Sequence, residues 1–91
     1  MTPKQWTAHT LQVHSFKNRD EVLASEICGC FYCLATFGPA EIHRWIDEDE
    51  KRVGLTALCP RCGVDFVIGS KTGFPLTQEL LRSMHEIWFS P

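Results

Sequence analysis

The chain has 91 residues, of which 44% are hydrophobic and 11% aromatic, and its formal net charge at pH 7 is −2. This apolar content excludes a disordered chain, and the length fits a single domain over residues 1–91. The nine Lys and Arg residues are scattered among eleven Asp and Glu residues, which argues against nucleic-acid binding driven by overall charge.

The stretch before the first cysteine predicts two helices. Thr2, Pro3 and Gln5 form a capping-box pattern, with an N-cap hydroxyl, a proline at the first helical position and a glutamine at N3. A second helix is expected over residues 18–27, with Asn18 as its N-cap and acidic residues in its first turn. This helix leads the chain to the first cysteines.

The middle of the chain predicts one short helix and two strands. The helix is expected over residues 40–46, directly after Pro39, and a charged turn follows over residues 47–52. The alternating apolar pattern predicts strands at residues 56–58 and 64–68, which we expect to pair as a rubredoxin-like hairpin. Residues 69–75 are rich in turn formers and are predicted to be a loop.

The last predicted element is a helix that begins after Thr77, which is placed to cap it. Apolar residues then recur at helical spacing and form a stripe that should close the core. The members of this stripe are Leu80, Leu81, Met84, Ile87 and Trp88.

Two Cys-x-x-Cys pairs predict one zinc site with four ligands, Cys30, Cys33, Cys59 and Cys62. Each such turn can direct two sulfurs to a centre about 2.3 Å away, and two turns complete the tetrahedron that zinc accepts. The second pair is followed by Gly63, which can adopt the positive φ that such a turn requires. Four thiolates leave no open coordination position, so we expect one structural Zn²⁺.

Two alternatives to zinc are disulfide bonds and a redox Cys-x-x-Cys motif. The chain has five cysteines, an odd number, and no secretory signal is recognisable, so we favour zinc and a cytoplasmic location. Cys28 provides a third thiol beside the first pair. We choose Cys30 and Cys33 because their spacing repeats that of the second pair, but a substitution of Cys28 for either one remains open.

Together these elements predict a small α+β zinc-binding domain. It should contain two zinc knuckles, of the zinc-ribbon or treble-clef-like kind, with a short β-hairpin and three to four helices. The runs Cys-Gly-Cys-Phe-Tyr-Cys at residues 28–33 and Thr-Ala-Leu-Cys-Pro-Arg-Cys-Gly-Val-Asp at residues 56–65 resemble a family of small bacterial cytoplasmic proteins. The resemblance implies a bacterial, cytoplasmic, zinc-binding domain and no particular activity.

A more distant similarity is to treble-clef nucleases of the endonuclease VII and HNH kind. In those enzymes an acidic, histidine-bearing hairpin lies between the cysteine pairs, and here the acidic residues 47–50 hold that place without the histidine. A hydrolytic centre needs such a general base, and only His43 is near enough in sequence to replace it. The candidates of this divergent nuclease would be His43, Asp47 and Asp49. We therefore assign no catalytic residue, and enzymatic activity is not the favoured reading.

The function that we favour is a structural-zinc module that binds another protein, or a second copy of itself, through an aromatic surface. The C-terminal helix should contribute to this surface, because a small core cannot cover every side of it, and either Trp88 or Phe89 should stay partly exposed. The alternative is a nucleic-acid-binding zinc domain with Arg44, Arg61 and Lys71 at phosphates. No apolar run reaches the roughly 18 residues of a membrane span, so no membrane partner is expected.

Overall fold

Helix α1 (Pro3–Gln12) starts as the capping-box pattern predicts. In the computed structural model, which describes residues 2–90, the Thr2 hydroxyl accepts a hydrogen bond from the Gln5 backbone N–H (3.2 Å). The Gln5 side chain in turn accepts from the Thr2 backbone N–H (2.8 Å). The chain leaves α1 through a 3₁₀ turn, η1 (Val13–Ser15).

Helix α2 (Arg19–Leu23) is shorter than the predicted range 18–27. Its end is fixed by Ser25, whose hydroxyl donates to the Glu21 carbonyl (2.8 Å) and accepts from the Lys71 backbone N–H (3.0 Å). Asn18 stands at the N-cap position, but its side chain makes no capping hydrogen bond. Asn18 is therefore at the predicted N-cap position, but the prediction that its side chain caps the helix is wrong.

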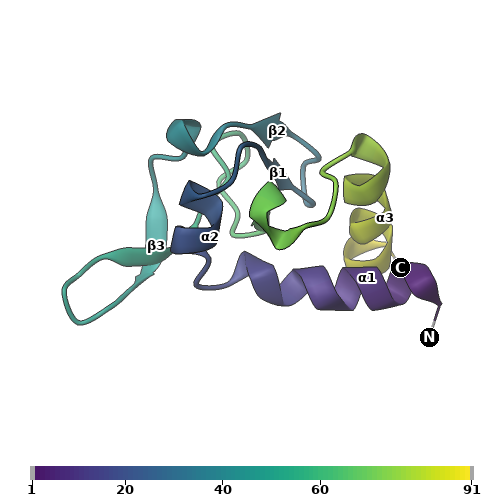
Figure 1. The fold of residues 1–91 in the computed structure, drawn as a ribbon, viewed down its shortest axis with the longest axis horizontal. Coiled ribbons are helices and arrows are strands. Elements are labelled where there is room, and N and C mark those ends of the chain that lie inside the picture. The colour runs from purple at the N-terminus through teal and green to yellow at the C-terminus, as the bar shows by residue number, and fades with distance from the viewer. Residues whose placement is uncertain (1, 91) are drawn as a thin grey trace.

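A three-stranded antiparallel sheet forms the centre of the fold, with strand order β2-β1-β5 (Figure 1). Strand β1 (Cys28–Cys30) pairs with β2 (Thr36–Phe37) on one side and β5 (Val67–Gly69) on the other. The middle residue of β1, Gly29, faces Ile68 of β5. The strand that was predicted over residues 64–68 therefore begins only at Val67, and it pairs with β1 and not with residues 56–58.

The second sheet is a separate antiparallel hairpin of β3 (Trp45–Glu48) and β4 (Gly54–Ala57). The predicted helix at 40–46 is wrong, because the helical stretch after Gly38 is only the 3₁₀ turn η2 (Pro39–Glu41). Trp45 and Ile46 then face Ala57 and Thr56 across the hairpin, so pairing and β-propensity outweigh the short helical pattern. The predicted pairing of β4 with the following strand is also wrong. The hairpin projects from one end of the molecule (Figure 1).

Helix α3 (Gln78–Phe89) closes the opposite end of the molecule, and the Thr77 hydroxyl caps it by accepting from the Leu80 N–H (3.1 Å). The predicted loop before it contains a 3₁₀ turn, η3 (Ser70–Thr72). Helix α3 packs on α1, where the Trp88 indole N–H donates to the Ala8 carbonyl (3.2 Å). Within residues 2–90, no helix is long and apolar enough to cross a membrane.

Two groups of buried side chains make up the core of the described residues. One lies between α1, α3 and the central sheet and consists of Ala8, Leu11, Phe31, Ile68, Leu81 and Met84. The other lies beside the cysteine pairs and consists of Val22, Cys28, Cys30, Phe37, Ile42, Ala57, Cys59 and Val67. Within the part of the chain that the structure describes, three α-helices and two antiparallel sheets surround these two groups, which confirms the predicted α+β class.

The buried side chain of Asn18 joins strands that the sequence analysis expected to pair directly. Its carbonyl oxygen accepts from the Ala57 N–H of β4 (3.1 Å), and its amide nitrogen donates to the Val67 carbonyl of β5 (2.8 Å). The same nitrogen donates to the His14 carbonyl (3.0 Å). One amide therefore bridges β4, β5 and η1.

We predict that Asn18→Ala lowers the free energy of unfolding by about 2–3 kcal/mol, because it leaves buried backbone groups of β4 and β5 without partners. The measurement is urea unfolding followed by circular dichroism. Gln12→Ala, which removes an amide from the half-buried end of α1, is the control and should change stability by less than about 0.5 kcal/mol. Equal stability of Asn18→Ala and the control would contradict the bridging role.

Candidate metal centre

The first cysteine pair lies on the tight turn between β1 and β2. The Cys30 N–H donates to the Ala35 carbonyl (3.0 Å), and the Leu34 N–H donates to the Cys30 carbonyl (2.8 Å). These two hydrogen bonds close a turn over residues 30–35, which includes Cys33. Leu34 has a φ of +69°, a left-handed conformation that costs a non-glycine residue about 1–2 kcal/mol.

The second pair repeats this hydrogen-bond pattern on the turn between β4 and β5. The Cys59 N–H donates to the Val64 carbonyl (2.9 Å), and the Gly63 N–H donates to the Cys59 carbonyl (2.9 Å). Gly63 has the positive φ that the sequence predicts, +82°. Both turns thus have the same spacing of donors and acceptors, with a left-handed residue directly after the second cysteine.

The two turns bring the sulfurs of Cys30, Cys33, Cys59 and Cys62 within 4.8 Å of one another. Two contacts of 3.7 Å join the turns, one between the sulfurs of Cys30 and Cys62 and one between those of Cys33 and Cys59. Sulfurs at the corners of a tetrahedron about 2.3 Å from its centre would be about 3.8 Å apart. All five cysteines are free thiols. The four sulfurs are therefore positioned to bind one metal ion.

Burial divides these four cysteines into two kinds. The first cysteine of each pair, Cys30 or Cys59, is buried, and the second, Cys33 or Cys62, is exposed. Burial raises the pKa of Cys30, against the effect of the Cys33 and Tyr32 N–H groups. At Cys59 burial also raises the pKa of the thiol. Hydrogen bonds from the Cys62 and Arg61 N–H groups outweigh this effect, so the pKa of Cys59 is lowered overall. The Arg61 N–H lies 3.3 Å from the Cys59 sulfur.

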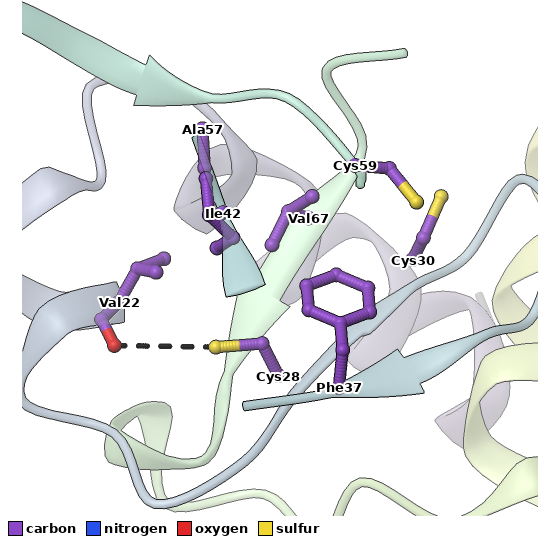
Figure 2. Close-up of a cluster of buried hydrophobic side chains, with 8 residues drawn as sticks. All are labelled: Val22, Cys28, Cys30, Phe37, Ile42, Ala57, Cys59 and Val67. Carbon is purple, nitrogen blue, oxygen red and sulfur yellow. Dashed lines mark hydrogen bonds between the residues drawn. The ribbon is translucent and has the colours of Figure 1, made fainter. Parts of the chain in front are cut away.

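Cys28 lies outside this group of sulfurs. Figure 2 shows the sulfurs of Cys30 and Cys59 directed toward each other, whereas the Cys28 sulfur points to the Val22 carbonyl, 3.9 Å away. Cys28 is fully buried, and this burial raises the pKa of its thiol to about 11. The structure thus brings Cys30 rather than Cys28 to the candidate metal centre.

The three nuclease candidates are engaged in separate local hydrogen bonds. Exposed His43 contacts the Glu41 carbonyl through Nδ1 (3.2 Å). Asp47 accepts from the Thr56 hydroxyl (2.7 Å), and Asp49 accepts from backbone N–H groups of its own hairpin loop. Across the described residues, the four cysteines are the one group of three or more His, Cys, Asp or Glu side chains placed to share a metal.

The basic residues proposed for phosphate binding lie at the surface, but they do not all present free charges. Arg61 forms an ion pair with Glu41 (2.7 Å between Nη2 and Oε1). Arg44 and Lys71 are exposed. Arg19, which sequence reasoning had not singled out as a packing residue, lies over the Trp45 ring at 4.7 Å and donates to the Gly54 carbonyl (2.9 Å).

An aromatic cluster lies against the first cysteine turn. Phe89 of α3 is its centre, with ring centroids 5.1 Å from Tyr32, 4.9 Å from Phe66 and 5.3 Å from His85. His85 is fixed by its Nδ1, 3.1 Å from the Phe31 carbonyl. The expectation that the C-terminal helix keeps an aromatic partly exposed is confirmed, since Trp88 and Phe89 are both half-buried. Sequence reasoning missed Tyr32, although its place between Cys30 and Cys33 was a usable signal.

The chemistry open to this centre follows from its donors. Four sulfurs around one point suit a soft or borderline cation, and together they leave no position for water or substrate. Comparison of the chain with protein-family models, with curated proteins and with solved structures finds no match.

We predict that Gly63→Ala destabilises the protein by about 1–2 kcal/mol, because alanine must adopt the left-handed conformation of Gly63. Gly38→Ala is a matched control: a Cβ meets no atom within 4 Å at either glycine, but Gly38 has an ordinary φ of −80°. Thermal unfolding of both variants in the same buffer measures the difference. Equal melting temperatures would show that the second turn does not need its left-handed residue.

We predict that Cys28→Ser leaves the metal content of the purified protein unchanged, because the Cys28 sulfur points to the Val22 carbonyl and does not belong to the group of four sulfurs. Cys30→Ser and Cys33→Ser should each lower the content, because each removes a sulfur of the group. Elemental analysis of the three purified variants provides the test. Loss of metal from Cys28→Ser, with retention in Cys30→Ser, would reverse the assignment.

Proposed function

We propose that the protein is a structural-zinc module of the zinc-ribbon kind that binds another protein through an aromatic surface. Its ligands would be Cys30, Cys33, Cys59 and Cys62. Zinc is favoured over other cations because it accepts a tetrahedron of thiolates without a geometric preference of its own. A site built from four thiols also suits the cytoplasm, where thiols stay reduced.

The metal would serve the fold rather than a reaction. Its ligands come from the β1–β2 turn and the β4–β5 turn, which are far apart in sequence. Four thiolates close the coordination sphere, so the free energy of binding is available to folding. In a chain of this size the core alone supplies little stability, which makes such a contribution valuable.

The observation that carries the proposed interaction is the placement of Tyr32. This residue is 46% exposed although it lies between two cysteines of the metal centre, and its ring rests on Phe89 of the C-terminal helix. We define the aromatic surface as Tyr32, Phe66, His85 and Phe89. Amphipathic aromatics held rigidly by packing are the side chains that protein interfaces favour.

The aromatic surface shares Phe66 with a hollow of about 300 Å³ at the C-terminal end of α1. Phe66 belongs to both, and the other lining residues include Val13 and Phe16, which are 63% and 56% exposed. Asp65 is the charged member of the lining. A partner that places an apolar side chain between Phe16 and Phe66, with a basic group near Asp65, would complement this surface.

The contacts of the charged residues favour protein binding over the two alternatives. Arg61, one of three expected phosphate contacts, is paired with Glu41, which weakens its attraction for nucleic acid. His43, Asp47 and Asp49 each have their own local partners, and a hydrolytic centre would need them to converge on one point.

The proposed interaction is tested with Tyr32→Ser, which removes an exposed ring and should leave the buried core intact. Val53→Ser is the control, since Val53 is 38% exposed on the β3–β4 hairpin, at the far end of the molecule from α3 (Figure 1). The partner is first isolated with the wild-type protein from cytoplasmic extract and then purified for affinity measurement. We expect Tyr32→Ser to weaken binding at least about 10-fold, as loss of an interface aromatic commonly does, and Val53→Ser to have no effect.

The same experiment can contradict the proposal. Equal affinity of the wild type and both variants would exclude the aromatic surface. Binding of DNA or RNA by the wild type at physiological salt, with an affinity that falls steeply as salt rises, would favour the nucleic-acid alternative.

A further inference from the structure

The two exposed sulfurs of the candidate metal centre differ chemically from the two buried ones. Cys33 and Cys62 are open to solvent, whereas Cys30 and Cys59 are enclosed by the core. Thiolate oxidation requires access of the oxidant to sulfur. A small polar oxidant in solution therefore reaches the centre first at Cys33 or Cys62.

Each exposed sulfur has a buried sulfur of the opposite turn at contact distance. Cys62 lies 3.7 Å from Cys30, and Cys33 lies 3.7 Å from Cys59. A sulfenic acid at either exposed position thus has a resolving thiolate beside it, and this thiolate belongs to the other turn. All four sulfurs lie within 4.8 Å of one another, and the two contacts of 3.7 Å both run between the turns, whereas in a redox Cys-x-x-Cys motif the resolving sulfur lies on the same turn.

We infer that the centre is a peroxide-oxidisable site, in which disulfides Cys30–Cys62 and Cys33–Cys59 replace the metal. This inference rests on the proposed function, because it takes the four cysteines to be metal-bound thiolates. The oxidant is hydrogen peroxide. The bonds that form run between the two turns, so the oxidised chain keeps the turns joined after the metal has left.

The reaction balances in two steps for each disulfide. The exposed thiolate attacks one peroxide oxygen, the S–O bond forms as the O–O bond breaks, and the departing hydroxide takes up a proton to become water. The buried thiolate then attacks this sulfur, the S–S bond forms as the S–O bond breaks, and a second hydroxide leaves and is protonated. Two thiolates are oxidised, one peroxide is reduced, and two waters are produced.

Loss of the metal follows from this change in the sulfurs. A thiolate is a metal ligand, and a disulfide sulfur has lost the charge that makes it one. The first disulfide removes two of four ligands, and the second removes the rest. Complete oxidation therefore takes two peroxides and releases one metal ion per chain. Cys28 takes no part, because it is buried and its sulfur points to Val22.

The experiment uses the full chain, reduced and carrying the metal with which it purifies. Hydrogen peroxide is added in steps, released metal is measured with a chromogenic chelator, and the products are digested with trypsin without reduction. Cleavage after Arg61 separates Cys59 from Cys62, whereas Cys28, Cys30 and Cys33 stay together in peptide 20–44. Bonds between the turns therefore yield one species of three peptides: 20–44, 53–61 and 62–71.

We expect metal release in parallel with the three-peptide species, a free Cys28, fragmentation that assigns Cys30–Cys62 and Cys33–Cys59, and reversal by dithiothreitol with added zinc. Trapping with dimedone should label Cys33 or Cys62 before Cys30 or Cys59. The matched control Cys28→Ser should give the same metal release and pairing.

The inference is overturned if peptides 53–61 and 62–71 are linked only to each other, which means that the bonds form within each turn. It also fails if metal is retained and all four thiols are recovered reduced under excess peroxide. These outcomes leave the proposed function intact. If the purified chain contains no metal, the proposed function fails, and the peptide map of the reduced, metal-free chain still decides the pairing.

Discussion

The convergence of four sulfurs from two turns is the constraint on which the other features of the structure depend. The turns are far apart in sequence, and the two strands that flank the second turn belong to different sheets, β4 to a separate hairpin and β5 to the central sheet. The second turn is not held by a ladder between its own two strands, because β4 and β5 lie in different sheets and are bridged by the Asn18 side chain. A cation bound by both turns would close the loop of chain between the two cysteine pairs. This would lower the conformational entropy of the unfolded chain far more than a surface contact does.

The first turn also connects the candidate metal centre to the rest of the molecule. Phe31 and Tyr32 lie between two of its cysteines, and one side chain is buried while the other is exposed. Phe31 is buried with the helical core residues, whereas Tyr32 lies at the surface against Phe89. The candidate metal centre, the core and the aromatic surface thus share a few consecutive residues, so a change at the four cysteines would be transmitted to the surface that we propose for binding.

Local patterns in the sequence predicted the features that depend on local chemistry. The capping box at Thr2, the cap at Thr77 and the positive φ of Gly63 each follow from a few neighbouring residues, and all three are present. The convergence of the two cysteine pairs was predictable because a Cys-x-x-Cys spacing has few other uses in a reduced chain.

The errors concern features that are decided by distant partners. Residues 40–46 carry a weak helical pattern, but Trp45 and Ile46 find partners across a hairpin, and no local rule predicts that choice. Asn18 is an ordinary N-cap by sequence, and only the fold shows that its amide is needed between two strands. The sequence does not predict the left-handed conformation of Leu34, because leucine rarely adopts it. That Leu34 and Gly63 hold equivalent positions in the two turns is seen only in the structure.

The central claim is that four thiolates of one chain hold a single zinc ion between the two turns. X-ray absorption spectroscopy at the zinc edge of the purified, reduced protein tests it most directly, since it identifies the metal and its neighbours together. The account predicts one zinc per chain with a first shell of four sulfurs at about 2.3 Å. A shell that contains nitrogen or oxygen at about 2.0 Å, or a reduced and folded protein that binds no zinc, would contradict it.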